Sequence, residues 1–116
     1  MGEQWTEHRP WGRFLNLLDT EFTKVKLIEV DPEKRLSYQS HQKRKEVWTV
    51  VAGEATVTLD DKEHRLNAGE NIVIPLGAKH RLANPSSSQK LSIIEVQTGS
   101  YFGEDDITRY QDDWGR

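Results

Sequence analysis

Two short stretches of the chain place metal-ligand side chains and turn residues at fixed spacings, and this pattern constrains the fold more than any other feature. The first stretch reads Gln39-x-His41-x4-Glu46-x6-Gly53. Successive residues on a strand point to opposite faces, so Gln39 and His41 share a face, and Glu46 can return on the neighbouring strand. The second stretch reads Gly69-x5-Pro75-x-Gly77-x2-His80-x3-Asn84. Because a divalent metal needs imidazole and carboxylate ligands converging from different strands, the pattern predicts a site.

The body of the chain reads as a string of short strands separated by turn signals such as Asp31-Pro32-Glu33, Gly53-Glu54 and Asp60-Asp61. Many short strands with almost no helical period predict an all-β sandwich or barrel. In Val25-x-Leu27, alternation predicts a buried face and a solvated face. Only the tail, from Gly103 to Gln111, is predicted to form a helical turn. The predicted strands are Phe14 to Leu18, Phe22 to Val30, Leu36 to His41, Glu46 to Val51, Ala55 to Leu59, Glu63 to Leu66, Ile72 to Ile74, Lys79 to Leu82 and Leu91 to Gln97.

Size and composition exclude several classes of protein. At 116 residues we expect one domain over residues 1–116. The net charge of −3 argues against a nucleic-acid surface, and no apolar run approaches membrane-spanning length. The first 13 residues lack the apolar core of a signal peptide. Among redox compartments, the absence of cysteine fits a cytoplasmic location best. With no cysteine, any metal must be held by nitrogen and oxygen ligands.

A lone histidine on a strand is more often structural or solvent-exposed than a ligand, and we interpret His8 and His64 in that way. The joint pattern favours the opposite interpretation for the other two histidines, because one explanation covers both the ligand types and the turn residues. The predicted metal ligands are Gln39, His41, Glu46 and His80.

These two stretches resemble the two motifs of the cupin superfamily, which implies a jelly-roll barrel, the double-stranded β-helix. The first motif departs at Gln39, where most cupins have a histidine. A set of two histidines, one glutamine and one glutamate suits Zn, and also Mn, Co or Fe, with positions left open for water or substrate. The glutamine weakens the case for an oxygen-activating cupin.

Further segments are similar to the type II mannose-6-phosphate isomerases. In that family the domain is often fused behind a mannose-1-phosphate guanylyltransferase. The chain has neither the length nor the Gly-rich loop for that half, so the resemblance implies the isomerase activity alone. The segments are Arg9-Pro10-Trp11-Gly12-x-Phe14, Leu36-Ser37-x-Gln39-x-His41, Ile74 to Pro85 and Ile94 to Arg109.

The implied reaction interconverts mannose 6-phosphate and fructose 6-phosphate through an enediolate, so the site needs a base, an oxyanion stabiliser and a phosphate ligand. Glu95 is the candidate base, since it alternates onto one face with Ile93 and Gln97, and a partly dry pocket would raise its pKa. Its structural alternative is an exposed strand residue. Arg109 is the candidate charge stabiliser or phosphate ligand, by similarity to the family, and otherwise pairs with Asp105 or Asp106. The phosphate candidates are Arg44, Arg81, Lys26 and Lys79.

Val47 stands where the family usually has a histidine, which is a departure from the family pattern beside the candidate ligand Glu46. A non-catalytic sugar-phosphate-binding cupin, or an isomerase or epimerase for another phosphorylated sugar, would carry a similar barrel. In each case the expected partner is a small sugar phosphate, with no nucleic acid or membrane, and a homodimer is expected because edge strands are commonly covered.

Overall fold

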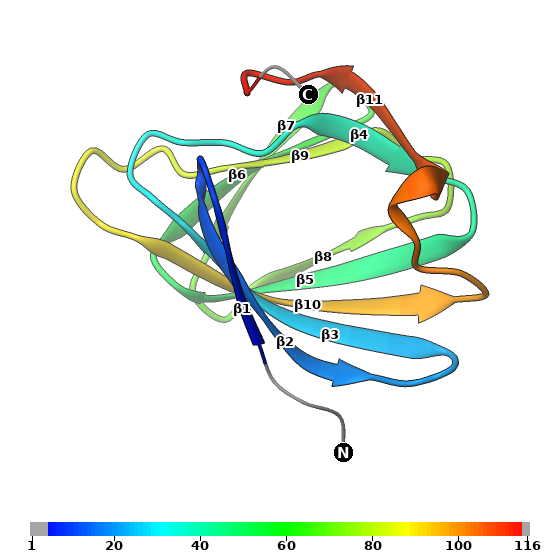
Figure 1. The fold of residues 1–116 in the computed structure, drawn as a ribbon. Helices are drawn as coiled ribbons and strands as arrows, with labels where there is room; N and C mark the ends of the chain where they lie inside the picture. Colours follow the sequence, from blue (N-terminus) through cyan, green and yellow to red (C-terminus); the bar gives the residue numbers. More distant parts are fainter. Residues whose placement is uncertain (1–4, 115–116) are drawn as a thin grey trace.

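The computed structural model describes residues 5–114, so residues 1–4 and 115–116 of the predicted domain lie outside the described part. The described chain forms two antiparallel sheets that face each other across a common interior (Figure 1). The first sheet contains, in spatial order, β1 (Trp5–Arg9), β2 (Gly12–Asp19), β3 (Thr23–Val30), β10 (Leu91–Gly99), β5 (Arg44–Ala52) and β8 (Asn71–Ile74). The second contains β11 (Ile107–Gln111), β4 (Tyr38–His41), β9 (His80–Ala83), β6 (Glu54–Leu59) and β7 (Lys62–Asn67).

The predicted turns lie where the sheets require them. Gly53 joins β5 to β6 with φ +87°, and a Cβ there would lie 2.7 Å from the carbonyl oxygen of Lys90, so only glycine fits. Asp60 and Asp61 join β6 to β7 with φ of 47° and 68°, a conformation that the short side chain of aspartate tolerates in two-residue hairpins. The all-β prediction is therefore confirmed.

The interior is apolar at one end and polar at the other. Along β10 the inward positions run Leu91, Ile93, Glu95 and Gln97, all buried. The first two pack into the hydrophobic core, and the last two bring a carboxylate and an amide into the same barrel. The buried residues of this core are Trp11, Ile28, Val30, Trp48, Val50, Ala55, Val57, Leu66, Ile74, Ala78, Leu82, Leu91 and Ile93.

The prediction for β3 is wrong in one respect. Val25 and Leu27 are only half-buried, and the alternate face, with Lys26, Ile28 and Val30, points inward. Lys26 lines the interior because a lysine can bury its aliphatic stem beside apolar neighbours. The strand alternates as expected, but its polar residue faces the cavity.

The helical turn predicted for Gly103 to Gln111 is also largely wrong. A single 3₁₀ turn spans Glu104–Asp106, and β11 (Ile107–Gln111) follows it. Ile107, Thr108 and Tyr110 favour extended backbone, and the free edge of β4 offers hydrogen-bonding partners. Among the described residues, no helix is long and apolar enough to cross a membrane.

Candidate metal centre and active-site cavity

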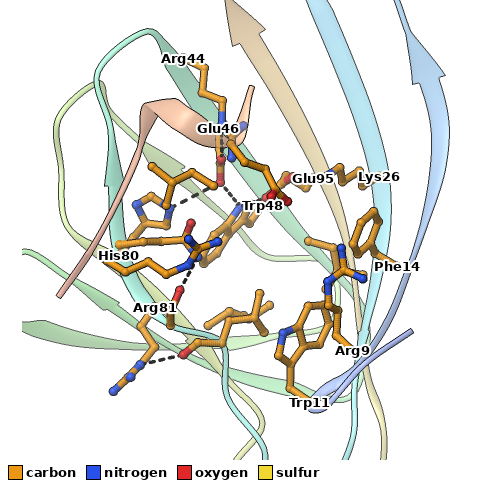
Figure 2. A pocket seen from close by; sticks show the side chains of 18 residues that line it. Arg9, Trp11, Phe14, Lys26, Arg44, Glu46, Trp48, His80, Arg81 and Glu95 are labelled. Carbon is orange, nitrogen blue, oxygen red and sulfur yellow. Dashed lines mark hydrogen bonds and ion pairs between the residues drawn. The ribbon is translucent and has the colours of Figure 1, made fainter. Parts of the chain in front are cut away.

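A cavity opens between the two sheets at the polar end of the interior (Figure 2). Both sheets contribute to its wall, and so does the segment around the 3₁₀ turn. The lining residues are Arg9, Trp11, Phe14, Lys26, Ile28, Leu36, Ser37, Gln39, Arg44, Glu46, Trp48, His80, Arg81, Leu82, Glu95, Glu104, Ile107 and Arg109.

Three of the four predicted metal ligands lie together beside this cavity. His41 ends β4, Glu46 lies in β5 and His80 begins β9, and each offers one ligand atom within 4.8 Å of the other two. Nδ1 of His41 lies 3.5 Å from Oε2 of Glu46, and Nε2 of His80 lies 3.8 Å from Oε1. All three are buried. Two imidazoles and a carboxylate at this spacing fit a divalent cation.

Gln39 is brought to the same region but has a partner of its own. Its backbone is in register with His80 on one side and with Arg109 on the other. Its Nε2 donates a hydrogen bond to Oγ of Ser37 at 3.0 Å, and the side chain lines the cavity. The role of Gln39 as a metal ligand stays a prediction.

Both histidines of the cluster are held in the neutral form. Burial, followed by the nearby positive charge of Arg44, lowers the pKa of His41 to about 3. Burial also lowers the pKa of His80, and its Nδ1 lies 3.1 Å from the carbonyl oxygen of Ala78. A neutral imidazole keeps a lone pair that a metal ion can use.

Arg44 lies against the same ligand atoms. Its Nε donates to Oε2 of Glu46 at 3.0 Å, one terminal nitrogen lies 2.8 Å from Nε2 of His41, and the other donates to the carbonyl oxygen of Phe102 at 3.2 Å. A cation bound by His41 and Glu46 would repel this guanidinium.

Glu95 and Glu46 form a buried pair of carboxyl groups around Trp48. The indole N–H of Trp48 lies 2.9 Å from Oε1 of Glu46 and 3.1 Å from Oε2 of Glu95, and the amide of Gln97 donates to the other oxygen of Glu95. Burial and the adjacent Glu95 raise the pKa of Glu46. The prediction of a raised pKa for Glu95 is wrong: burial alone would raise it, but Lys26, the hydrogen bond with Glu46 and Arg44 together lower it. Of the two carboxyl groups, Glu95 is the one whose surroundings favour the ionised form, which is the form that a base needs.

Arg109 enters the cavity from β11 without the helix-end ion pair that was its alternative. Asp105 accepts a hydrogen bond from the hydroxyl of Tyr101, and Asp106 accepts from the backbone N–H groups of Gln42 and Lys43. Nε of Arg109 is buried with no hydrogen-bond partner among the described residues. This side chain is thus free to meet an anionic or carbonyl oxygen.

The remaining phosphate candidates differ in whether they line the cavity and in whether their donor groups are already bonded. Nε of Arg81 donates to the carbonyl oxygen of Leu36 at 2.9 Å, and its terminal nitrogens donate to Gln111 at 3.3 and 3.1 Å. Lys79 lies outside the cavity lining, with Nζ 4.7 Å from the ring centroid of Tyr110. Lys26 lines the cavity. His8 and His64 are exposed, as expected.

Sequence reasoning missed the contribution of the N-terminal hairpin. It predicted no strand over Trp5–Arg9, yet β1 pairs with β2 and carries Arg9 to the cavity, beside Trp11 and Phe14. Figure 2 shows these three side chains across the cavity from His80. The signal that could have found them is the motif Arg9-Pro10-Trp11-Gly12-x-Phe14, whose place in the fold the sequence left open.

Residues 2–112 match the protein family described as mannose-6-phosphate isomerase C-terminal. Among curated proteins, the alginate biosynthesis protein AlgA of Pseudomonas aeruginosa is 49% identical over 109 residues, which is 94% of this chain and 22% of that protein. A mannose-1-phosphate guanylyltransferase of Escherichia coli is 46% identical over 109 residues, covering 94% of this chain and 23% of that protein. The chain thus spans less than a quarter of the length of these relatives.

Solved structures share the fold at low sequence identity. An uncharacterised protein with a double-stranded β-helix domain from Klebsiella pneumoniae superposes with a TM-score of 0.72 at 20% identity, covering 84% of this chain and 77% of that one. The two facing sheets are therefore the cupin double-stranded β-helix that the motifs imply.

Proposed function

The chain belongs to the mannose-6-phosphate isomerase C-terminal family of cupin domains, and on that premise we propose that it interconverts mannose 6-phosphate and fructose 6-phosphate. Its relatives carry names from alginate biosynthesis and from guanylyl transfer to mannose 1-phosphate. An isomerase of this kind would connect fructose 6-phosphate to the mannose phosphates on which such relatives act.

One observation carries the proposal: the buried carboxyl group of Glu95 lies directly beside the candidate metal ligands, in a cavity that both sheets line. Glu95 shares the indole N–H of Trp48 with Glu46, and Glu46 lies within 4 Å of both histidines. Aldose–ketose isomerisation needs a base next to an electrophilic centre, because the proton it removes is acidic only while the adjacent carbonyl is polarised.

The proposed reaction moves one proton between two carbons. The carboxylate of Glu95 removes the proton from C2 of open-chain mannose 6-phosphate, and the C–H electrons form the C1–C2 double bond of an enediolate with its charge on O1. A proton passes from O2 to O1, the carbonyl re-forms at C2, and Glu95 returns its proton to C1. Arg109, which has no ion pair with a described residue, supplies positive charge to the oxyanion.

The remaining residues prepare the site for these steps. His41, Glu46 and His80 would hold a divalent cation, which when bound supplies Lewis-acid polarisation of the carbonyl. Trp48 and Gln97 fix the orientation of Glu95 by hydrogen bonds to its two oxygens. Glu46 and Glu95 are buried, and charges interact more strongly in buried surroundings than in water.

A coupled isomerase assay tests the proposal. We expect purified protein to convert mannose 6-phosphate to fructose 6-phosphate, to lose this activity with a chelator and to regain it with Zn, Mn, Co or Fe. Calorimetry with the same sugar phosphates runs beside the assay. Saturable binding without turnover at any metal would overturn the isomerase proposal and favour a sugar-phosphate-binding cupin.

A further inference from the structure

Cationic side chains outnumber acidic ones around the cavity. Its wall carries the three carboxyl groups of Glu46, Glu95 and Glu104, together with a larger set of basic groups. A cavity with excess positive charge and low-dielectric walls attracts anions. The basic residues of the lining are Arg9, Lys26, Arg44, Arg81 and Arg109.

Three of these five basic residues have other contacts, or a position at the reacting end of the cavity, that make them weaker candidates for a separate anion-binding site. Arg81 is bonded to Leu36 and Gln111, and Arg44 lies on the candidate metal ligands. Arg109 is in register with Gln39, which in turn pairs with His80, so it belongs to the end of the cavity where the reaction is proposed. Arg9 and Lys26 remain. Arg9 forms an ion pair with Glu7 and Lys26 is the cross-strand neighbour of Glu95, but both side chains also line the cavity.

Arg9 and Lys26 lie around one aromatic ring. Nζ of Lys26 is 4.2 Å and the guanidinium carbon of Arg9 is 5.2 Å from the ring centroid of Phe14. Arg9 also donates to the carboxylate of Glu7 and to the carbonyl oxygen of His8 at 3.1 Å, which leaves further N–H groups for a ligand. An anion bound between the two side chains would be attracted by both positive charges.

This pair lies at a useful distance from the candidate metal centre. Trp48, Glu95 and Lys26 are consecutive partners across β5, β10 and β3. Neighbouring strands are about 4.8 Å apart, so Lys26 lies roughly 10 Å from the strand that carries Glu46. Figure 2 places Arg9 and Phe14 on the side of the cavity opposite His80. An open-chain hexose phosphate can reach from one end to the other.

We propose that Arg9 and Lys26, on either side of Phe14, form the subsite for the phosphate group of the substrate. This inference rests on the proposed function for the identity of the ligand, a phosphorylated open-chain sugar. The N-terminal hairpin of β1 and β2 is then part of the binding site, because β1 carries Arg9 and β2 carries Phe14. The bidentate guanidinium and the ammonium group together match a dianionic phosphate.

Calorimetry with mannitol 1-phosphate, which has no carbonyl to isomerise, measures the subsite separately from the reaction. We expect Arg9→Gln and Lys26→Gln each to weaken binding about 10- to 100-fold, since hydrogen bonds between charged groups are the strong ones. Inorganic phosphate should compete with the ligand in the wild type and more weakly in both variants. Metal content should not change.

The matched controls are Arg13→Gln on β2, the hairpin partner of β1, and Lys24→Gln on β3, the strand of Lys26. Each removes one positive charge outside the cavity lining. Three outcomes would overturn the subsite. The variants and the controls could lose the same amount of affinity, or both variants could keep the wild-type affinity. The wild type could also bind mannitol as tightly as mannitol 1-phosphate. A different result would contradict the proposed function alone: the protein would bind mannitol 1-phosphate in a way that depends on Arg9, but would show no isomerase activity. Isomerase activity with an unchanged KM in both variants contradicts the subsite alone.

Discussion

The two ends of the cavity are built in different ways. At the centre formed by His41, Glu46 and His80, each side chain is at most 3% exposed and comes from a different strand. At the end formed by Arg9 and Lys26, two flexible side chains contact one ring, and the side chain of Arg9 is 27% exposed. The first arrangement fixes ligand atoms before anything binds, while the second can adjust to a solvated anion.

The difference has an energetic consequence. Charges in a buried site interact strongly and tolerate little displacement, whereas partly exposed charges are screened by water and salt. We therefore expect substitutions at the buried end to abolish chemistry, and substitutions at the exposed end to change affinity.

Removing a buried ligand should have the largest effect. His80→Ala removes one imidazole from the cluster, so the metal content measured by elemental analysis should fall to a small fraction of the wild-type content. Isomerase activity should fall about 10³-fold, because a bound cation contributes several kcal/mol to such reactions. The control is His64→Ala, which removes an exposed histidine on β7. A His80→Ala protein that keeps its metal would contradict the assignment of the centre.

Glu95→Gln should separate chemistry from metal binding. The amide keeps the size of the side chain but cannot accept the proton, so kcat should fall about 10²- to 10⁴-fold. Metal content and KM should change little. Glu63→Gln, at an exposed position of β7, is the matched control. Loss of metal together with kcat would mean that Glu95 acts as a ligand and not as the base.

Gly12→Ala should distort the hairpin of β1 and β2 and leave the metal ligands His41, Glu46 and His80 in place. A Cβ at Gly12, where φ is +150°, would lie 2.1 Å from the backbone oxygen of Glu29, so β1 and β2 must shift. We expect the free energy of unfolding to fall by about 1–3 kcal/mol, measured by urea denaturation, and mannitol 1-phosphate to bind more weakly. Gly69→Ala is the control, because φ there is +91° but no atom lies within 4 Å. Equal losses in the two proteins would show that backbone strain, and not the clash, dominates.

Trp48→Phe should have the smallest effect. It removes the N–H shared by Glu46 and Glu95 while keeping most of the apolar volume, so kcat should fall by about tenfold or less. Trp114→Phe removes an indole N–H bonded to the carbonyl of Arg35, outside the cavity lining, and should leave kcat unchanged. An unchanged kcat in Trp48→Phe would show that Gln97 alone orients Glu95.

The two ends also differ in how far the sequence predicts them. His41, Glu46 and His80 can be recognised from spacing, because the two-residue period of a strand determines which side chains share a face. The inward face of β3 was assigned wrongly, since Val25 and Leu27 have the same period as Lys26 and Ile28. A helical turn is the sequence-based expectation for the tail from Gly103 to Gln111, and the pairing of β11 with β4 overrides it.

The sequence by itself determined the all-β class, the turns at Gly53 and Asp60-Asp61, and the residues able to hold a cation, because these depend on local backbone preference and strand period. Only the tertiary structure decided that Arg9 reaches the cavity, that Arg81 is bound to distant backbone oxygens, and that Lys26 lowers the pKa of Glu95. Each of these depends on contacts between segments far apart in the chain, and the energy of a charge or hydrogen bond is set by the neighbours that folding provides.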